Sequence, residues 1–353
     1  MAVHIALDVM GGDRGPAAMV SGAVQAVHEL DLEVTLLGDA QQINKALGDL
    51  RVQDSRLHIV HTSQIISMDE SPIEAVRKKR DASIVVAFGL LKEARVDAVV
   101  SAGNSGATMA AAVRMVGRLK KIARPGIASV FPTLKNPVVM MDVGANVDCR
   151  PQHLFQFGVM AAAFSRVLFG RQRPTVGLLS IGEEGGKGNT LVKQTHELFL
   201  KSSLNYIGNV EGRDIFQGNT DVIICDGFVG NVCLKVSEGL AEAVMAMLRL
   251  ELSKSVAAKV GYFLARHAFT SFKKRVDYSE YGGAPLLGMN GTGIVCHGRS
   301  DAKAIKNAIK VAAEMVRNRV NDHIVQLLND AEAAGVLEQG SNPDSMEPAE
   351  TVT

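Results

Sequence analysis

The sequence predicts an α/β fold, because short apolar runs alternate with helical patterns along most of its 353 residues. Hydrophobic residues make up 47% of the chain, aromatic residues only 5%, and Trp is absent. A core of aliphatic side chains suits a buried parallel sheet better than an all-β sandwich. The length allows one large or two closely packed domains. We expect one large domain over residues 1–340 and a disordered polar tail over residues 341–353.

Nine short apolar runs predict strands. The predicted strands are His4–Met10, Glu33–Leu37, Leu57–His61, Ala98–Ser101, Gly126–Phe131, Val138–Val143, Thr175–Ile181, Val222–Cys225 and Gly293–Cys296. Between and after them, apolar residues at helical spacing predict helices. The predicted helices are Ala17–Glu29, Ser71–Glu93, Gly106–Leu119, Pro151–Leu168, Val232–Leu250 and Ser300–Ala331, the last with Ser300 as its N-cap.

Two basic segments have alternative interpretations. Between Ser253 and Lys274, apolar residues recur at helical spacing among lysines and arginines, and we take residues 252–276 as an amphipathic projection. Such a helix can lie in a membrane surface or meet an acidic partner, or it can simply pack on the body with its lysines in water. The basic run at residues 77–80 is either a solvated helix face or a docking face for an acidic protein.

Composition excludes several classes of protein. The formal net charge of +1 gives no overall basic field, which argues against a dedicated nucleic-acid-binding protein. The four cysteines form no CxxC pair, and the nine histidines show no paired metal-binding spacing. We therefore expect reduced thiols, no metal and no cofactor. The chain begins with a strand-like segment and has no apolar run long enough to span a bilayer, so we expect a cytoplasmic location.

Glycine-rich turns follow five of the predicted strands. They occupy residues 8–13, 101–108, 142–146, 181–190 and 225–231. None matches the GxGxxG or GxxxxGK[ST] patterns of nucleotide-binding proteins. Gly lets successive backbone N–H groups converge, and a helix N-terminus adds a partial positive charge. Each turn alone is compatible with a structural role, but together they predict a broad polar cleft for an anionic ligand.

Polar side chains within these turns are the candidate functional residues. Lys187 lies at the start of a predicted helix, where the positive field of the helix N-terminus mildly repels a cation. A lysine at this position is explained if an anion binds between its ammonium group and the helix N-terminus. A flexible, solvated lysine is the alternative. Four asparagines lie in or beside these turns: Asn104, Asn146, Asn189 and Asn231. Their neutral side-chain amides can donate hydrogen bonds to phosphate oxygens or to a thioester carbonyl. Alternatively, they only form the turns. Three strands end in carboxylates that act as helix caps or as oriented acid–base groups: Asp8, Asp142 and Asp226.

Taken together, these motifs resemble the acyl-carrier-protein:phosphate acyltransferase family of bacterial phospholipid synthesis. The resemblance covers residues 2 to 330. It is carried by IALDVMGGD at 5–13, SAGNSGA at 101–107, DVGAN at 142–146, IGEE at 181–184, KGN at 187–189, DGFVGN at 226–231 and YGGAPLLG at 281–288. One departure is Arg14, where the family usually has His.

The resemblance implies a three-layer Rossmann-like sheet related to the phosphotransacetylase and isocitrate dehydrogenase folds, in a homodimer. It implies transfer of a long-chain fatty acyl group from an acyl carrier protein thioester to inorganic phosphate. The acyl phosphate would then serve a downstream glycerol-3-phosphate acyltransferase. It also implies peripheral association with the membrane surface through a helical projection, which corresponds to residues 252–276.

This chemistry needs little acid–base assistance, because phosphate is already nucleophilic and a thiol with a pKa of about 8.5 leaves readily as thiolate. The enzyme must chiefly hold the reactants and stabilise the oxyanion. We expect Lys187 to bind phosphate and the oxyanion, with Asn189, Asn231 and Asp226 completing the catalytic set. The expected substrate-binding residues are Asp8, Gly11, Gly12, Gly103, Asn104, Ser105, Gly106, Asn146, Gly227 and Glu280.

Three other functions remain open on the sequence. A phosphotransacetylase-type enzyme using acyl-CoA shares the phosphate chemistry. A catalytically silent scaffold at the membrane surface would not need the Lys187 loop. A dehydrogenase is disfavoured by the missing dinucleotide fingerprint.

Overall fold

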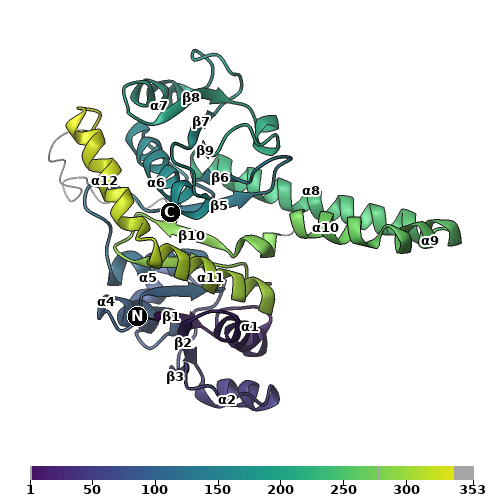
Figure 1. Cartoon of the computed structure of the whole chain (residues 1–353). Coiled ribbons are helices and arrows are strands. Elements are labelled where there is room, and N and C mark those ends of the chain that lie inside the picture. Colours follow the sequence, from purple (N-terminus) through teal and green to yellow (C-terminus); the bar gives the residue numbers. More distant parts are fainter. Residues whose placement is uncertain (1, 277, 338–353) are drawn as a thin grey trace.

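Eleven strands form one sheet in the computed structural model, which describes residues 2–276 and 278–337 (Figure 1). The strand order is β3-β2-β1-β4-β11-β10-β5-β6-β9-β7-β8. The strands span β1 Val3–Asp8, β2 Leu32–Gly38, β3 Leu57–His61, β4 Ala98–Ser101, β5 Gly126–Phe131, β6 Val138–Met141, β7 Thr175–Leu179, β8 Asn205–Val210, β9 Val222–Ile224, β10 Ala284–Leu287 and β11 Thr292–Val295.

Strand direction changes at the centre of the sheet. The pairs β11–β10, β10–β5 and β5–β6 are antiparallel, whereas the strands on either flank run parallel to their neighbours. Three reversals mean that β1, β4 and β11 point one way and β6, β9 and β7 point the other. The carboxyl ends of the two flanks therefore lie on opposite edges of the sheet.

Helices cover both faces of the sheet. One apolar cluster contains Ile5 and Leu7 of β1 with residues of α1, α6, α11 and α12, and a second contains Ala6 of β1 with residues of α3, α4 and α5. This arrangement confirms the predicted three-layer α/β fold. The helices of the body span α1 Gly15–Glu29, α2 Ala40–Asp49, α3 Pro72–Lys78, α4 Ser83–Lys92, α5 Ser105–Met115, α6 Pro151–Phe169, α7 Thr190–Leu200, α11 Ala302–Arg317 and α12 Val320–Ala333.

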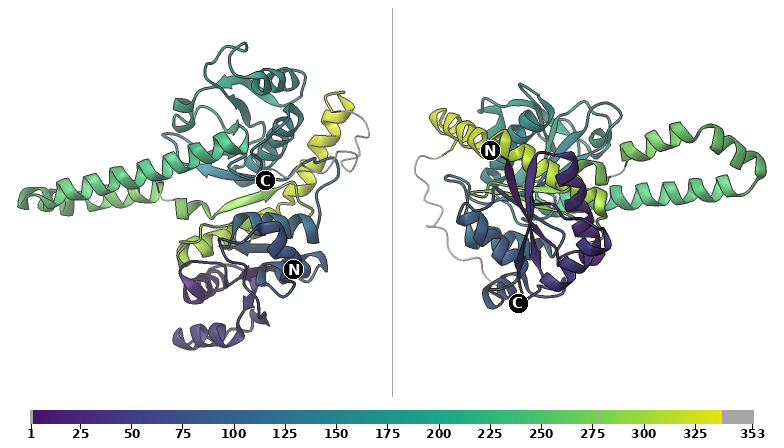
Figure 2. Two further views of the ribbon diagram at one scale, coloured as in Figure 1. Left: turned by 180° about the vertical axis from the view of Figure 1, so that it is seen from behind. Right: turned by 60° about the horizontal axis from the view of Figure 1, so that its bottom comes forward.

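A helical arm extends away from this body (Figure 2). The long helix α8 (Gly227–Ser253) runs outward, α9 (Val256–Leu264) forms the tip, and α10 (Arg266–Val276) leads back. Along α8, exposed apolar residues recur every three or four positions, from Val232 to Leu250. Among the described residues, no helix has the length and apolarity to cross a membrane.

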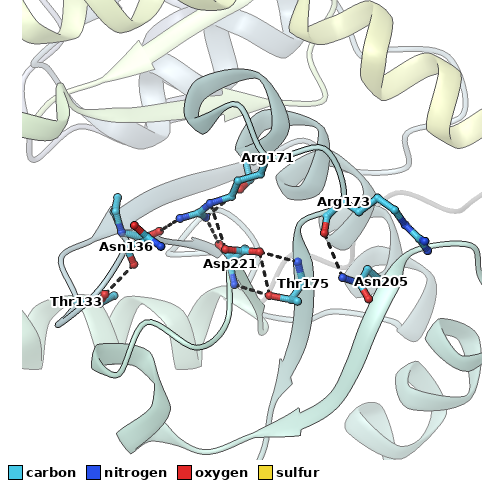
Figure 3. A network of polar contacts seen from close by, with 9 residues as sticks. Thr133, Asn136, Arg171, Arg173, Thr175, Asn205 and Asp221 are labelled. Atoms are coloured by element: carbon cyan, nitrogen blue, oxygen red, sulfur yellow. Dashed lines mark hydrogen bonds and ion pairs between the residues drawn. The ribbon is translucent and has the colours of Figure 1, made fainter.

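A polar network fixes the amino ends of the strands in the second flank (Figure 3). Asp221 accepts hydrogen bonds from the backbone N and Oγ1 of Thr175, at 2.8 and 3.1 Å, and lies 3.1 Å from Nε of Arg171. Arg171 also donates to the carbonyl of Pro137 at 2.8 Å. These contacts tie together the starts of β6, β7 and β9, far from their carboxyl ends.

Two predicted helices are each divided in the structure, so those predictions were wrong. Residues 71–93 break because Ala82 forms a β-bridge with Gln64. Residues 300–331 break where Arg319 takes a positive φ of 51°, and Asp301 rather than Ser300 caps α11 by accepting from the backbone N of Ala304.

Two strands were not predicted. β8 contains Gly208 at a φ of 100°, and β10 contains Pro285, so neither segment resembles a regular strand. The predicted tail over residues 341–353 lies outside the described residues.

Candidate active site

A cavity of about 900 Å³ connects the two edges of the sheet. The first edge contributes Gly103 and Ser105 beside α5, and the second contributes Gly144 after β6. One side of the cavity is the inner face of α8, from Asn231 to Arg249, and the opposite side is β5 with the loop after it. Further lining comes from the end of β11 with the residues that follow it, from the start of β10 with the residues before it, and from Met68, Phe216 and Phe272. Segments far apart in the sequence therefore meet at this cavity, where α8 leaves the body.

At the first edge, the turns after β1 and β4 pack directly on one another. A Cβ atom on Gly11 would lie 2.6 Å from the backbone N of Gly103, so this contact requires Gly. The buried Asp8 carboxylate accepts from Oγ of Ser83 at 2.6 Å and from Oγ of Ser101 at 2.8 Å. Burial raises the pKa of Asp8, and these hydrogen bonds act against that shift. Asp8 therefore organises the edge beneath the cavity.

Asn104 serves the architecture of this edge. It caps α5 by accepting from the backbone N of Ala107 at 3.0 Å, and its amide donates to the carbonyl of Met68 at 3.0 Å. The side chain thus holds the 67–70 loop against the start of α5. Gly106 lies in the same contact, because a Cβ atom there would lie 2.7 Å from Cγ of Pro72. A further Gly of this edge, Gly12, faces Met19.

At the second edge, Asp142 has a similar organising role. Its buried carboxylate accepts from the backbone N of Ile127, Ala145 and Asn146, and from the side-chain amide of Asn146. Burial raises the pKa of Asp142, and these hydrogen bonds oppose the shift. The carbonyl of Asn146 accepts from the backbone N of Gly227 at 2.7 Å. Asn146 and Gly227 therefore fix the start of α8.

The start of α8 presents Asn231 to the cavity. Asp226 caps the helix by accepting from the backbone N of Val229 at 2.9 Å. One turn further along α8, Asn231 lines the cavity. It lies against Gly144, because a Cβ atom on Gly144 would be 3.5 Å from Cγ of Asn231. Among the four candidate asparagines, Asn231 is the one whose side chain lines this cavity.

The Lys187 loop follows β7 on the second edge and does not line the cavity. Lys187 is exposed, and Asn189 caps α7 by accepting from the backbone N of Val192 at 2.9 Å. Two side-chain oxygens beneath the loop, Oγ of Ser180 and Oδ1 of Asn209, are buried without a hydrogen-bond partner. Parallel neighbours lie about 4.8 Å apart, so β7 ends roughly 10 Å from the end of β6. The loop therefore lies beside the Asn231 end of the cavity.

Sequence reasoning missed a charged cluster in the cavity wall. Nε2 of His297, just after β11, lies 2.8 Å from Oε1 of Glu238 on α8, and Nζ of Lys235 lies 2.9 Å from Oε2. Burial opposes ionisation of Glu238, but the hydrogen bonds from His297 and Lys235 outweigh it and hold its pKa at about 2. The sequence did contain one indication of this cluster, because His297 and Gly298 directly follow a predicted strand, as the other candidate residues do.

Two other groups show no reactive character. Cys296 lines the cavity, but burial raises the pKa of its thiol to about 12, so it is no thiolate nucleophile near neutral pH. Glu280 lies outside the cavity lining, and its carboxylate pairs with Nζ of Lys303 at 2.6 Å.

The sequence of this chain is similar to those of known proteins over most of its length. A family model described as fatty acid synthesis protein matches residues 3–323. A phosphate acyltransferase of Nitratidesulfovibrio vulgaris is 51% identical over 325 residues, covering 92% of this chain and 94% of that protein. A phosphate acyltransferase of Syntrophotalea carbinolica is 52% identical over 326 residues, with the same coverage of both chains.

Solved structures share the fold at low sequence identity. A phosphotransacetylase from Streptococcus pyogenes aligns with a TM-score of 0.62 at 18% identity, covering 90% of this chain and 94% of that one. A 4-hydroxythreonine-4-phosphate dehydrogenase from Klebsiella pneumoniae aligns with a TM-score of 0.53 at 13% identity, covering 90% and 100%.

The class of protein follows: the chain is an acyltransferase with a mixed α/β fold. Because the family model spans most of its length and the relatives share about half of its residues, the chain belongs to the fatty acid synthesis protein family. This membership confirms the resemblance stated from the sequence.

Proposed function

We propose that the protein transfers a long-chain fatty acyl group from an acyl carrier protein thioester to inorganic phosphate, giving an acyl phosphate for the acylation of glycerol 3-phosphate. The observation that carries this proposal is the cavity, which joins a polar end at Asn231 and Gly144 to an apolar trough along α8. The relatives named phosphate acyltransferase support phosphate as the acceptor.

The trough suits an extended acyl chain. From Asn231 to Arg249, α8 covers about 27 Å at roughly 1.5 Å per residue. Apolar side chains line this length from both sides: Val130, Phe131, Leu134, Phe216, Leu234, Ala241, Met245 and Phe272. Elongated apolar surface of this kind favours a long acyl chain over an acetyl group, which would leave the trough exposed to water.

The polar end suits the reaction centre. Asn231 can donate to the thioester carbonyl, and Ser105 stands at the N-terminus of α5, where the helix field favours an anion. Lys187 would bind phosphate from its loop beside this end and stabilise the developing oxyanion. The buried, unpartnered Oγ of Ser180 beneath that loop offers a further donor. In this proposal Asp226 and Asn189 position the two helices that frame the centre.

A basic face beside the cavity suits an acidic carrier protein. α3 packs against α5, next to Met68 in the cavity lining. Within the basic run, Lys78 and Lys79 pair with Glu74 and Glu70, whereas the exposed side chains of Arg77 and Arg80 point to solvent. Two exposed arginines, one in α3 and one just after it, can pair with carboxylates on a docked carrier.

The helical arm supplies surfaces for two further partners. The apolar stripe on α8 lies on a different face from the cavity lining, and burying it against a second copy would give the homodimer. At the tip, Val256, Phe263 and Leu264 are at least 63% exposed, next to the exposed basic residues Lys259 and Arg266. Apolar and basic groups together favour peripheral binding to an anionic membrane surface.

The test is phosphate-dependent release of thiol from palmitoyl-loaded acyl carrier protein. We expect steady thiol release with phosphate present, acyl phosphate as the product, and no release when phosphate is omitted. Equal release without phosphate would show simple thioester hydrolysis and would contradict the proposal. Release from palmitoyl-CoA alone would favour the phosphotransacetylase-type alternative.

A further inference from the structure

Three side chains able to bind a metal converge at the far end of the first flank. His4, Glu33 and His58 are each the second residue of their strand, in β1, β2 and β3. Each offers one ligand atom, and these atoms all lie within 4.8 Å of one another. Among the described residues, no other group of three such side chains meets this condition. The three positions are too far apart in sequence for any spacing motif to reveal them.

Strand register places the three side chains on the same face of the sheet. His4 pairs with Glu33 across β1 and β2, and His58 pairs with Thr35, two residues beyond Glu33, across β2 and β3. Nε2 of His58 lies 2.8 Å from Oε2 of Glu33, and Nε2 of His4 lies 2.7 Å from Oγ1 of Thr35. The two imidazole rings stand 5.2 Å apart between their centroids.

We propose that His4, Glu33 and His58 bind one divalent transition metal ion, with Zn²⁺ as the best match. Two imidazoles and one carboxylate are ligands that Zn²⁺ accepts, whereas Mg²⁺ and Ca²⁺ require oxygen ligands. Zn²⁺ bonds of about 2.0–2.2 Å place tetrahedral ligand atoms roughly 3.4 Å apart. The present ligand atoms lie within 4.8 Å of one another, with His58 Nε2 and Glu33 Oε2 at 2.8 Å, so side-chain rotation has to adjust spacings on both sides of that value.

The charge and the exposure of the cluster suit a cation taken up from solvent. The carboxylate of Glu33 offsets part of the charge of the ion. Because His4 is half-buried while His58 and Glu33 are about 40% exposed, the ion would enter from solvent and keep a water as its fourth ligand.

Such an ion would be structural. The cluster lies at the amino ends of its strands, whereas Asp8 and the cavity turns lie at the carboxyl ends. It would cross-link β3, the edge strand, to β2 and β1. An ion that binds the folded chain but not the unfolded chain increases the free energy of unfolding.

The test is titration of chelator-treated protein with Zn²⁺, monitored by calorimetry and by thermal unfolding. We expect one ion per chain and a higher unfolding midpoint. His58→Ala and Glu33→Gln should each weaken binding at least about tenfold, since even outer-shell partners of a metal contribute that much. His28→Ala, which removes an exposed histidine of α1 outside the cluster, should leave binding unchanged.

Thermal unfolding without metal shows whether each variant is folded, so a loss of binding can be separated from a loss of structure. Acyl transfer by metal-free wild type and by His58→Ala should remain equal. A wild-type protein that binds no Zn²⁺, or variants that bind it as tightly as wild type, would overturn the proposal.

Discussion

Nε2 of His297 and Oε1 of Glu238 lie 2.8 Å apart in the wall of the cavity. His297 follows β11 in the first flank of the sheet, and Glu238 lies on α8, which begins in the second flank. The pair therefore joins the two flanks at the wall of the cavity. The next turn of α8 repeats the connection, because Glu242 pairs with Arg299 at 2.7 Å.

The first prediction concerns acid stability. The folded pKa of Glu238 is about 2, below its usual value of 4.5, so ionised Glu238 stabilises the fold fully above pH 4.5. That contribution is lost as the pH falls from 4.5 through 2. Glu238→Gln should therefore lower the free energy of unfolding at pH 6 and have little effect near pH 2. Denaturant unfolding of both proteins at several pH values measures this, and a difference that does not change with pH would contradict it.

The second prediction uses two glycines of α8. A Cβ atom on Gly230 would lie 1.9 Å from the carbonyl O of Asp142, whereas at Gly239 nothing lies within 4 Å. Gly230→Ala should destabilise the protein by about 1–3 kcal/mol or more through overpacking. Gly239→Ala should stabilise it by about 0.5–1 kcal/mol, since Ala favours helix. Equal effects in urea unfolding would show that α8 does not pack on Asp142 as described.

The third prediction concerns Lys187. If it stabilises the oxyanion, Lys187→Ala should lower kcat at least about a hundredfold with the fold intact. Lys193→Ala provides the matched control, because Lys193 is also exposed, on the helix that follows the same loop. Steady-state kinetics measure kcat for Lys187→Ala and for Lys193→Ala, and circular dichroism shows whether each variant is folded. Normal kcat for Lys187→Ala would remove this residue from the mechanism.

The fourth prediction concerns the acyl trough. Ala241 lines the cavity about midway along α8, and a larger side chain there would block the outer part. Ala241→Phe should raise KM for palmitoyl carrier protein about tenfold or more, because several methylenes lose their contacts at about 0.8 kcal/mol each. Transfer of a short acyl group is the internal control and should be unchanged. Equal losses for both substrates would place the acyl chain elsewhere.

The fifth prediction concerns the tip of the arm. Phe263 and Leu264 of α9 are 63% and 77% exposed. Replacing both with Asp should abolish sedimentation with anionic phospholipid vesicles, while transfer in solution persists. Sedimentation equal to wild type would argue against the tip as the membrane contact.

The fold was predictable where periodicity is strong and local. β3, β4 and β5 have the predicted bounds, and the alternation of strands and helices was enough to predict three layers. The three antiparallel junctions could not be predicted, because they depend on β10, whose Pro285 does not resemble a central strand. The five glycine-rich turns predicted one broad polar cleft, whereas in the structure these junctions distribute them over two edges of the sheet.

The candidate site was predictable in part for the same reason. Asn231, predicted as catalytic, and Gly103 and Ser105, predicted to bind substrate, all line the cavity, and their roles stay predictions. Asn104 and Asn146 have side chains bonded to the fold itself, which sequence cannot distinguish from ligand contacts. His297 and Glu238 were missed because their contact depends on α8 passing the residues that follow β11, which are distant in the sequence.

The most direct test of the proposed reaction compares two donors with the same palmitoyl group, one on acyl carrier protein and one on CoA, at saturating phosphate. We predict a higher kcat/KM for the carrier, and a loss of that advantage when Arg77 and Arg80 are both replaced by Glu. A kcat/KM for palmitoyl-CoA equal to or above that of the carrier, unchanged by the replacements, would contradict a carrier-dependent acyltransferase.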